Sequence, residues 1–384
     1  MTSTALHKAT EVGSVHGPLR GYHREWYVVS PSADFPGTGR VKVGEPREDA
    51  LWFDRRCFAS EDALLTELAR RRLPRIPPVH RLGEGPSLHG FIEGTPLDAL
   101  APAGTPLGAG HLDQIMETFA RLGAMRPAGF PVPRLCRAED RPADGDSAGF
   151  LRSLIRFTRE RAYRRHLPRY GRLFNQLGLP RGALGARSPL AAAAAALTPR
   201  PFCLLHGDLH RANFIVDEAG DLWTIDWELA MLGDPLYDLA THLYLTHYPA
   251  RQRREVIQRW QDVMSRVLPG STAGTEADLP RYLAYKRAQS VYTDVVRHAG
   301  ALLGARGAGA DAGAGAGTST GAGAGAGVAS ARLRRERLRA SAKEVHQVLA
   351  RGAEELGLRE VPTPAEVEDA YAAFGAVRQV RSWG

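Results

Sequence analysis

Acidic and amide side chains gather in one short stretch of this 384-residue sequence, which contains Asp208, Asn213 and Asp226. Transfer of a phosphoryl group from a nucleotide needs a group that orients the acceptor hydroxyl, ligands for a metal ion and cations that neutralise the phosphates. Mg²⁺ takes oxygen ligands and keeps several waters, so a few carboxylates and one amide oxygen on short loops suit it. The stretch is therefore a candidate phosphoryl-transfer site.

The chain around these residues predicts a β-hairpin that brings them together. Two short apolar runs, 214–216 and 222–225, flank a turn-forming sequence, which is typical of a hairpin. Asn213 precedes the first strand and Asp226 follows the second, so the two side chains are expected to lie close together. Asp208 is then placed to orient the hydroxyl proton of an acceptor, while Asn213 and Asp226 hold Mg²⁺.

The same region contains three longer motifs: His206-Gly-Asp208-x4-Asn213, Ile225-Asp226-Trp227-Glu228 and Gly233-Asp234-Pro235-x2-Asp238-Leu239-Ala240. In this order and spacing they resemble the aminoglycoside phosphotransferase and choline kinase superfamily. The resemblance is dense over residues 203–240 and looser over 20–97, whereas 241–384 match only as helices. It implies an α+β, protein-kinase-like bilobal fold, with a β-rich N-terminal lobe and a larger helical C-terminal lobe.

Carried over residue by residue, the resemblance implies that Asp208 is the catalytic base and that Asn213 and Asp226 are metal ligands. It also implies that His206 and Asp238 brace the catalytic loop.

Two further residues of this region are candidates for supporting roles. Glu228 is a candidate for a supporting role near the metal. His210 either touches the γ-phosphate or is an ordinary loop histidine, and the sequence leaves both interpretations open.

The nucleotide-binding lobe supplies a candidate phosphate clamp. Lys42 lies centrally in a predicted strand and matches the family lysine that contacts the α- and β-phosphates. Glu61 is its expected ion-pair partner, because a carboxylate on the apolar stripe of a predicted helix (from Cys57 to Leu68) needs a buried partner. Glu67, which faces away from that stripe, is the fallback.

A hinge is predicted where this lobe ends. The backbone of Phe91, Ile92 and Glu93, up to Gly94, would meet the adenine edge. No GxGxxG motif is present, and residues 21–25 occupy the place of the glycine-rich loop.

The expected domain organisation follows from this hinge. The N-terminal nucleotide-binding lobe would comprise residues 1–94, with 1–17 as a loose lead-in. The helical lobe with the catalytic loop and acceptor site would comprise 95–384. Within it, the Gly- and Ala-rich segment 304–328 cannot build a core and predicts a flexible insertion.

Composition sets further limits on function. The net charge is +8, but the arginines are spread along the chain, so we expect no nucleic-acid partner; a cluster from Arg332 to Arg339 is predicted to be a solvated helix face. No apolar stretch is long enough to span a membrane. Cys57, Cys136 and Cys203 show no metal-ligand spacing and are predicted to be buried, reduced thiols of a cytoplasmic protein.

Together these features predict an ATP- and Mg²⁺-dependent small-molecule kinase. The resemblance makes an aminoglycoside or related antibiotic, and hence antibiotic resistance, the favoured assignment. The alternatives are a choline- or homoserine-like metabolite, a sugar, or a nucleotide-binding pseudokinase. The helices after Asp238 must choose the acceptor, although Tyr282, Tyr285 and Tyr292 are predicted to be core residues rather than its pocket. The sequence leaves the oligomeric state open.

Overall fold

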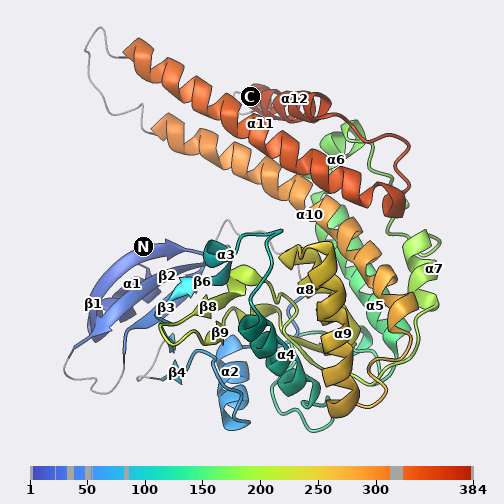
Figure 1. The fold of residues 1–384 in the computed structure, drawn as a ribbon. Helices are drawn as coiled ribbons and strands as arrows, with labels where there is room; N and C mark the ends of the chain where they lie inside the picture. Colours follow the sequence, from blue (N-terminus) through green and yellow to red (C-terminus); the bar gives the residue numbers. More distant parts are fainter. Residues whose placement is uncertain are drawn as a thin grey trace. The chain divides into compact units, whose positions relative to one another are not determined.

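The computed structural model describes residues 3–21, 23–32, 39–47, 53, 55–81, 86–311 and 323–381. The chain divides into two compact units, Met1–Ser153 with Ala196–Tyr282 and Leu154–Ala195 with Leu283–Gly384. An antiparallel sheet near the N-terminus is followed by a mostly helical chain (Figure 1). The predicted α+β class is therefore confirmed.

The first unit begins with a five-stranded sheet in the order β1-β2-β3-β5-β4. Its antiparallel strands are β1 (Gly13–Arg20), β2 (Arg24–Pro31), β3 (Val41–Pro46), β4 (Val79–His80) and β5 (Leu88–Gly90). In β3, Val41 and Val43 are buried in the core on one face, which leaves Lys42 on the other because successive side chains alternate. Strands β2 and β3 pair in antiparallel register, with Val28 opposite Lys42.

Helix α1 (Thr4–Val12) packs on the sheet and corrects the prediction of a loose lead-in. Ala5, Ala9 and Val12 lie on its buried face, and the side chain of Ser3 caps it by accepting from the amide of Leu6 at 2.9 Å. Small apolar residues gave only a weak helical signal. Strand β1 contains Gly and Pro, and it is ordered by pairing with β2, a contact that a local pattern cannot show.

Helix α2 (Glu61–Arg70) begins later than predicted, because the Ser60 side chain caps it through the amide of Ala63. Cys57 and Phe58 therefore precede the helix. They lie in an extended segment that pairs with residues 133–136, through an antiparallel bridge between Phe58 and Arg134.

Two smaller sheets frame the candidate site. One pairs β7 (Cys203–Leu205) with β10 (Met231–Gly233), and the other has the order β6-β8-β9, from β6 (Thr95–Pro96), β8 (Phe214–Val216) and β9 (Leu222–Thr224). The predicted hairpin of β8 and β9 is confirmed. Gly94 precedes β6 with φ +148°, and a Cβ there would lie 2.2 Å from the carbonyl oxygen of Val216. A side chain at this position would prevent β6 from approaching β8.

The first unit also contains the helices α3 (Leu97–Leu100), α4 (Ala109–Gly123), α8 (Pro235–Thr246) and α9 (Ala250–Val267). Two more helices, α5 (Ser147–Phe157) and α10 (Thr275–Asp311), begin in the first unit and end in the second. Short 3-10 turns occur at Ala138–Asp140, Arg211–Asn213 and Trp227–Leu229. Helix α4 packs against α9, where Gly123 leaves room for the side chain of Met264.

The second unit is helical. After a π-helical turn (Thr158–Tyr163) and a 3-10 turn (Arg164–His166) come α6 (Leu167–Gln176), α7 (Pro189–Ala195), α11 (Gly323–Leu356) and α12 (Pro364–Arg381). Tyr285 and Tyr292 of this unit are 1% exposed, and Tyr282 of the first unit is 0% exposed. All three are therefore core residues, as predicted. None of the described helices is long and apolar enough to cross a membrane.

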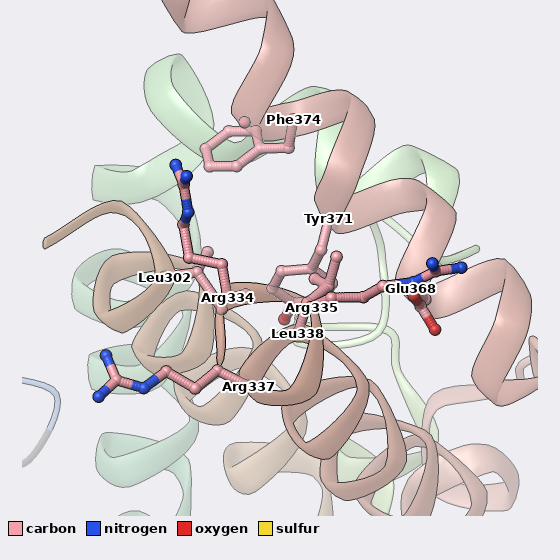
Figure 2. A pocket seen from close by; sticks show the side chains of 10 residues that line it. Leu302, Arg334, Arg335, Arg337, Leu338, Glu368, Tyr371 and Phe374 are labelled. Atoms are coloured by element: carbon pink, nitrogen blue, oxygen red, sulfur yellow. The ribbon is translucent and has the colours of Figure 1, made fainter. Parts of the chain in front are cut away.

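A cavity of about 230 Å³ opens between α10, α11 and α12 (Figure 2). Apolar and aromatic side chains such as Tyr371 and Phe374 form its wall, and Arg334, Arg335 and Arg337 of the predicted arginine-rich face lie around it. None of the predicted site residues lines it. Of the predicted insertion, residues 312–322 lie outside the described part, and its flanks belong to α10 and α11.

A fully buried ion-pair network ties three parts of the first unit together. The guanidinium of Arg200 bonds the carboxylate of Asp234 at 2.8 Å and that of Asp278 at 2.6 Å. Tyr282 donates its hydroxyl to Asp234, which also caps α8 by accepting from the amide of Leu236. The segment before β7 is thus fixed to the starts of α8 and α10. In the motif Gly233-Asp234-Pro235, Gly233 ends β10, Asp234 caps α8 and Pro235 is the first residue of that helix.

We expect Arg200→Met to lower the free energy of unfolding by about 3–5 kcal/mol, because it leaves the buried carboxylate of Asp234 without a counter-charge and leaves Asp278 with Arg281 as its remaining arginine. Urea denaturation measures the change. The matched control is Arg259→Met, which breaks surface pairs with Asp113 and Glu255 and should cost about 0–1 kcal/mol. Equal losses in the two variants would contradict this role of Arg200.

Candidate active site

The loop between β7 and β8 carries the predicted catalytic residues, and α8 holds it in place. The carboxylate of Asp238 accepts hydrogen bonds from the amides of His206 at 2.9 Å and Gly207 at 2.8 Å. Gly207 has φ +82°, and a Cβ there would lie 2.4 Å from the carbonyl oxygen of Leu229. The loop therefore turns sharply against the chain that follows Asp226, and only glycine fits the turn.

His206 connects this loop to the residue before Asp226. Its Nε2 donates to the carbonyl oxygen of Ile225 at 3.0 Å, and its Nδ1 accepts from the amide of Asp208 at 3.3 Å. Burial lowers the pKa of His206 to about 4, although the charge of Asp208 opposes the shift. The ring is thus neutral at neutral pH, in the tautomer that both bonds require, and His206 and Asp238 have the geometry of the predicted braces.

Asn213 and His210 orient the carboxylate of Asp208. The amide nitrogen of Asn213 donates to the Asp208 carbonyl at 2.8 Å and to its Oδ2 at 3.3 Å, so the other end of the Asn213 side chain, Oδ1, remains for a cation. His210 Nε2 lies 3.4 Å from the same Oδ2. Burial would lower the pKa of His210, but its hydrogen bond to Asp208 raises it overall. His210 therefore faces Asp208, an arrangement that neither sequence interpretation anticipated.

Asp226 stands among other carboxylates. Its backbone has φ 63° and ψ 66°, a left-handed conformation that is uncommon for residues other than glycine. The residue is exposed, yet the protein atoms packed around its carboxyl group, followed by the charges of Glu228, Glu61 and Asp208, raise its pKa to about 8. This corner of the site carries more negative charge than its own side chains neutralise.

A divalent cation would relieve that excess charge. Within the described ranges no three His, Cys, Asp or Glu side chains surround one metal-sized point. The predicted ligand set is instead one carboxylate, Asp226, and one amide oxygen, Asn213, which suits Mg²⁺ because it keeps several of its waters. The donor set and the crowding of negative charge therefore both fit Mg²⁺.

Glu228 is held by two residues from the N-terminal part of the chain. It pairs with Nδ1 of His23, in the β1–β2 connection, and with the guanidinium of Arg56, just before α2. Burial would raise the pKa of Glu228, but His23 and Arg56 outweigh it and lower the pKa overall. Sequence reasoning missed both partners, because nothing local in the sequence links residues so far apart. Tyr22 of the same connection lies outside the described residues.

Lys42 and Glu61 approach the site from β3 and α2. Burial lowers the pKa of Lys42, whereas the charges of Glu61 and Asp226 oppose the shift, and its Nζ lies 4.2 Å from the centre of the Trp26 ring. The predicted ion pair between Lys42 and Glu61 is not a direct contact in the described chain. Glu61 instead accepts from the amide of Trp227 at 3.0 Å, next to Asp226.

The fallback partner, Glu67, belongs elsewhere. It bonds Arg70 at 2.7 Å and Arg71 at 2.5 Å on its own helix. The hydrogen bond from Arg70 is the main cause that lowers the pKa of Glu67 to about 2. Glu67 is therefore a structural residue of α2.

Part of the predicted hinge is already bonded to Arg40, the residue that precedes β3. The amide of Phe91 donates to the carbonyl oxygen of Arg40 at 2.8 Å, and the guanidinium of Arg40 binds the carboxylate of Glu93. The Phe91 amide thus cannot donate to adenine without breaking a sheet bond. An adenine contact in this segment would fall to the backbone of Ile92 or Glu93.

The sequence profile of the phosphotransferase enzyme family matches residues 43–269, more than half of the chain. No curated protein matches the sequence. The chain is similar to the solved structure of a choline/ethanolamine kinase family protein from Mesorhizobium loti, at 16% identity and TM-score 0.48, covering 97% of this chain and 100% of that one.

Two phosphotransferases are among the other similar structures. One is the macrolide 2'-phosphotransferase MphH from Brachybacterium faecium, at 16% identity and TM-score 0.46, covering 76% of this chain and 92% of that one. The other is a thermostable mutant of aminoglycoside phosphotransferase APH(4)-Ia, at 14% identity and TM-score 0.41, covering 77% and 91%.

The brace between α8 and the catalytic loop makes a testable prediction. Asp238→Asn replaces one of two accepting oxygens with a donor that faces an N–H group, so the free energy of unfolding should fall by about 1–3 kcal/mol. Urea denaturation gives the value, with the surface change Asp262→Asn on α9 as the control. If the two variants were equally stable, Asp238 would not be bracing the loop.

Proposed function

This chain belongs to the phosphotransferase enzyme family, and we propose that it transfers the γ-phosphoryl group of ATP, with Mg²⁺, to a hydroxyl group of a small molecule. The observation that supports this most is the convergence of Asp208, Asn213 and Asp226, joined by His206 and the β8–β9 hairpin. Phosphoryl transfer needs mainly positioning and charge neutralisation, and these residues supply groups for both.

Asp208 is proposed to accept the hydrogen bond of the acceptor hydroxyl. Its carboxylate is 27% exposed, so a substrate can reach it, while Asn213 and His210 fix its orientation from the protein side. A base held in this way aligns the attacking oxygen with the γ-phosphorus and takes up the proton as the new P–O bond forms.

Asn213 and Asp226 are proposed to hold Mg²⁺, which supplies neutralisation of the charge on the transferring phosphoryl group. Asp226 is kept in its left-handed backbone conformation by its neighbours: the amide of Trp227 is bound by Glu61, and Glu228 is bound by His23 and Arg56. Both residues that follow Asp226 are therefore fixed from the nucleotide-binding part of the chain.

Lys42 is proposed to contact the nucleotide phosphates. The nearby carboxylates of Glu61 and Asp226 favour its charged form and so counter the effect of burial. Phosphates brought between Lys42 and Asp226 would find a cation on one side and the metal ligands on the other.

For the acceptor we propose an aminoglycoside or a related antibiotic, with choline- or homoserine-like amino alcohols and sugars as the next classes to test. The resemblance of the three motifs supports this choice. The net charge of +8 disfavours long-range attraction of a polycation, so an aminoglycoside would need a locally acidic pocket.

We expect Asp208→Asn to lower kcat by about 10²–10⁴-fold, the usual contribution of a positioned general base, while Mg·ATP binding stays within about twofold. ADP release with a panel of acceptors, and mass spectrometry of the phosphorylated product, measure the loss. Asp262→Asn serves as the surface control. Full turnover in the Asp208 variant would rule out this assignment, and ATP binding without transfer to any acceptor would favour a pseudokinase.

Removal of the Lys42 ammonium group should lower the affinity for the nucleotide. We expect Lys42→Met to weaken Mg·AMP-PNP binding by about 10–100-fold, because a charge-assisted hydrogen bond contributes about 1.5–3 kcal/mol. Isothermal titration calorimetry provides the Kd, and Lys343→Met, at an exposed position on α11, is the control. An unchanged Kd would remove Lys42 from the phosphate site.

A further inference from the structure

Cys57 and Cys136 meet at a place that the phosphoryl-transfer chemistry does not use. Their Sγ atoms are 3.7 Å apart, although 79 positions separate the two residues in the sequence. Backbone hydrogen bonds hold the two segments side by side: Leu135 donates to the carbonyl of Cys57 at 2.7 Å, and Ala59 donates to that of Pro133 at 3.0 Å. Cys57 is buried as predicted, but Cys136 is only half-buried, so its predicted burial is wrong, and the proximity of the two thiols was not foreseen.

Two guanidinium groups lie beside this cysteine pair. Arg55 is 5% exposed; its Nη1 bonds the hydroxyl of Ser153 at 2.9 Å, and its buried Nε has no partner among the described residues. Arg141 donates to the carbonyl of Cys136 at 2.6 Å. Within the described chain, neither guanidinium has a carboxylate at ion-pair distance. Arg141 is exposed, whereas Arg55 is buried; since a buried cation without a counter-charge is costly, a thiolate is favoured beside Arg55.

Asp144 is the acidic residue that lines the small cavity beside the two cysteines, and it is already engaged. Its carboxylate binds Arg126 at 2.8 Å and accepts from the amide of Phe202 at 2.6 Å. It therefore offers Arg55 and Arg141 no direct ion pair, and the sulfur atoms are left to balance their charge.

The charge falls on Cys136. The hydrogen bond from Cys57, together with Arg55 and Arg141, lowers the pKa of Cys136 to about 5 in spite of partial burial. The same hydrogen bond and burial raise the pKa of Cys57. Both directions favour the thiolate on Cys136 and the thiol on Cys57.

A small reagent can reach the pair. Cys136 is partly exposed, and both cysteines line a cavity of about 20 Å³ together with Arg55, Arg134 and Arg141. That volume is enough for a molecule about the size of water.

We propose that Cys57 and Cys136 are an oxidisable dithiol, which a peroxide converts to a disulfide that weakens nucleotide binding. The Cys136 thiolate attacks one peroxide oxygen, the O–O bond breaks, and the leaving hydroxide takes a proton to become water. The resulting sulfenic acid is attacked by the sulfur of Cys57, which loses its proton, and the S–O bond breaks to release a second water. The two thiols are oxidised by two electrons, and the peroxide is reduced.

The pair is linked to the nucleotide site through the chain on either side of Cys57. Arg56 precedes it and binds Glu228; Glu61 follows at the start of α2 and binds the amide of Trp227. A disulfide requires the sulfurs to close from 3.7 Å to roughly 2.05 Å, and in this proposal the segment bearing Cys57 shifts as they close. That shift displaces the two contacts that fix the residues after Asp226. This half of the proposal rests on the proposed function.

The experiment treats the full-length protein with hydrogen peroxide and follows its intact mass and its peptide map. We expect the loss of two hydrogens, a Cys57–Cys136 peptide and full reversal by dithiothreitol. Cys203→Ala, at a cysteine outside the pair, should behave as the wild type does. Cys57→Ser should stop at a dimedone-reactive sulfenic acid on Cys136, and Cys136→Ser should not form the disulfide. Failure to form the Cys57–Cys136 link would overturn the proposal.

Iodoacetamide labelling of Cys136, followed by mass spectrometry, tests the thiolate separately. The rate at pH 6 should exceed half of the rate at pH 8, whereas a thiol with the ordinary pKa of about 8.5 would react at pH 6 roughly 80-fold more slowly than at pH 8. Arg55→Met should slow labelling at pH 6 several-fold, and Arg152→Met, at an exposed arginine on α5, should not. An ordinary pH profile in the wild type would overturn the assignment of a thiolate.

Calorimetry with Mg·AMP-PNP separates the two halves of the proposal. We expect the oxidised protein to bind at least about tenfold more weakly than the reduced protein, with affinity restored by dithiothreitol. Equal affinity of the two forms would overturn the effect on nucleotide binding. If the reduced protein bound no nucleotide while the disulfide still formed, the proposed function would fail and the dithiol would stand.

Discussion

Negative charge concentrated around Asp226 is the constraint on which the rest of the site depends. The protein atoms packed around its carboxyl group and three neighbouring carboxylates raise the pKa of Asp226 to about 8, and the ammonium of Lys42 offsets only part of this effect. The protein keeps the arrangement because each neighbour is held by other contacts: Glu228 by His23 and Arg56, and Glu61 by the amide of Trp227. Repulsion among carboxylates of this kind is expected where the active form of a protein binds a cation.

The fold maintains this arrangement with rigid devices placed behind the site. Asp238 fixes two amides of the catalytic loop, and Arg200 fixes the start of the same helix, α8, through Asp234. Gly207 lets the loop pass close to Leu229. Each device couples segments distant in sequence, so the position of Asp208 is set by the packed core rather than by the loop itself.

Much of this could be predicted where the signal is local. Turn-forming residues between two apolar runs predict the β8–β9 hairpin, which brings Asn213 and Asp226 close to Asp208. The alternation of apolar and polar residues predicts that Val41 and Val43 are buried. Helix α1 and the late start of α2 were missed, because they depend on sheet packing and on a cap at Ser60. The contacts of His23, Arg56 and Arg200, and the meeting of Cys57 with Cys136, involve pairs remote in sequence that no periodicity reveals.

The central claim is that the corner formed by Asn213 and Asp226 takes a divalent cation together with a nucleotide. Its most direct test is a Mn²⁺ titration followed by electron paramagnetic resonance, with AMP-PNP present, on the wild type and on Asp226→Asn. We predict tight, nucleotide-dependent Mn²⁺ binding in the wild type that Mg²⁺ displaces, and its loss in the variant. Identical Mn²⁺ binding by the two proteins would contradict the account.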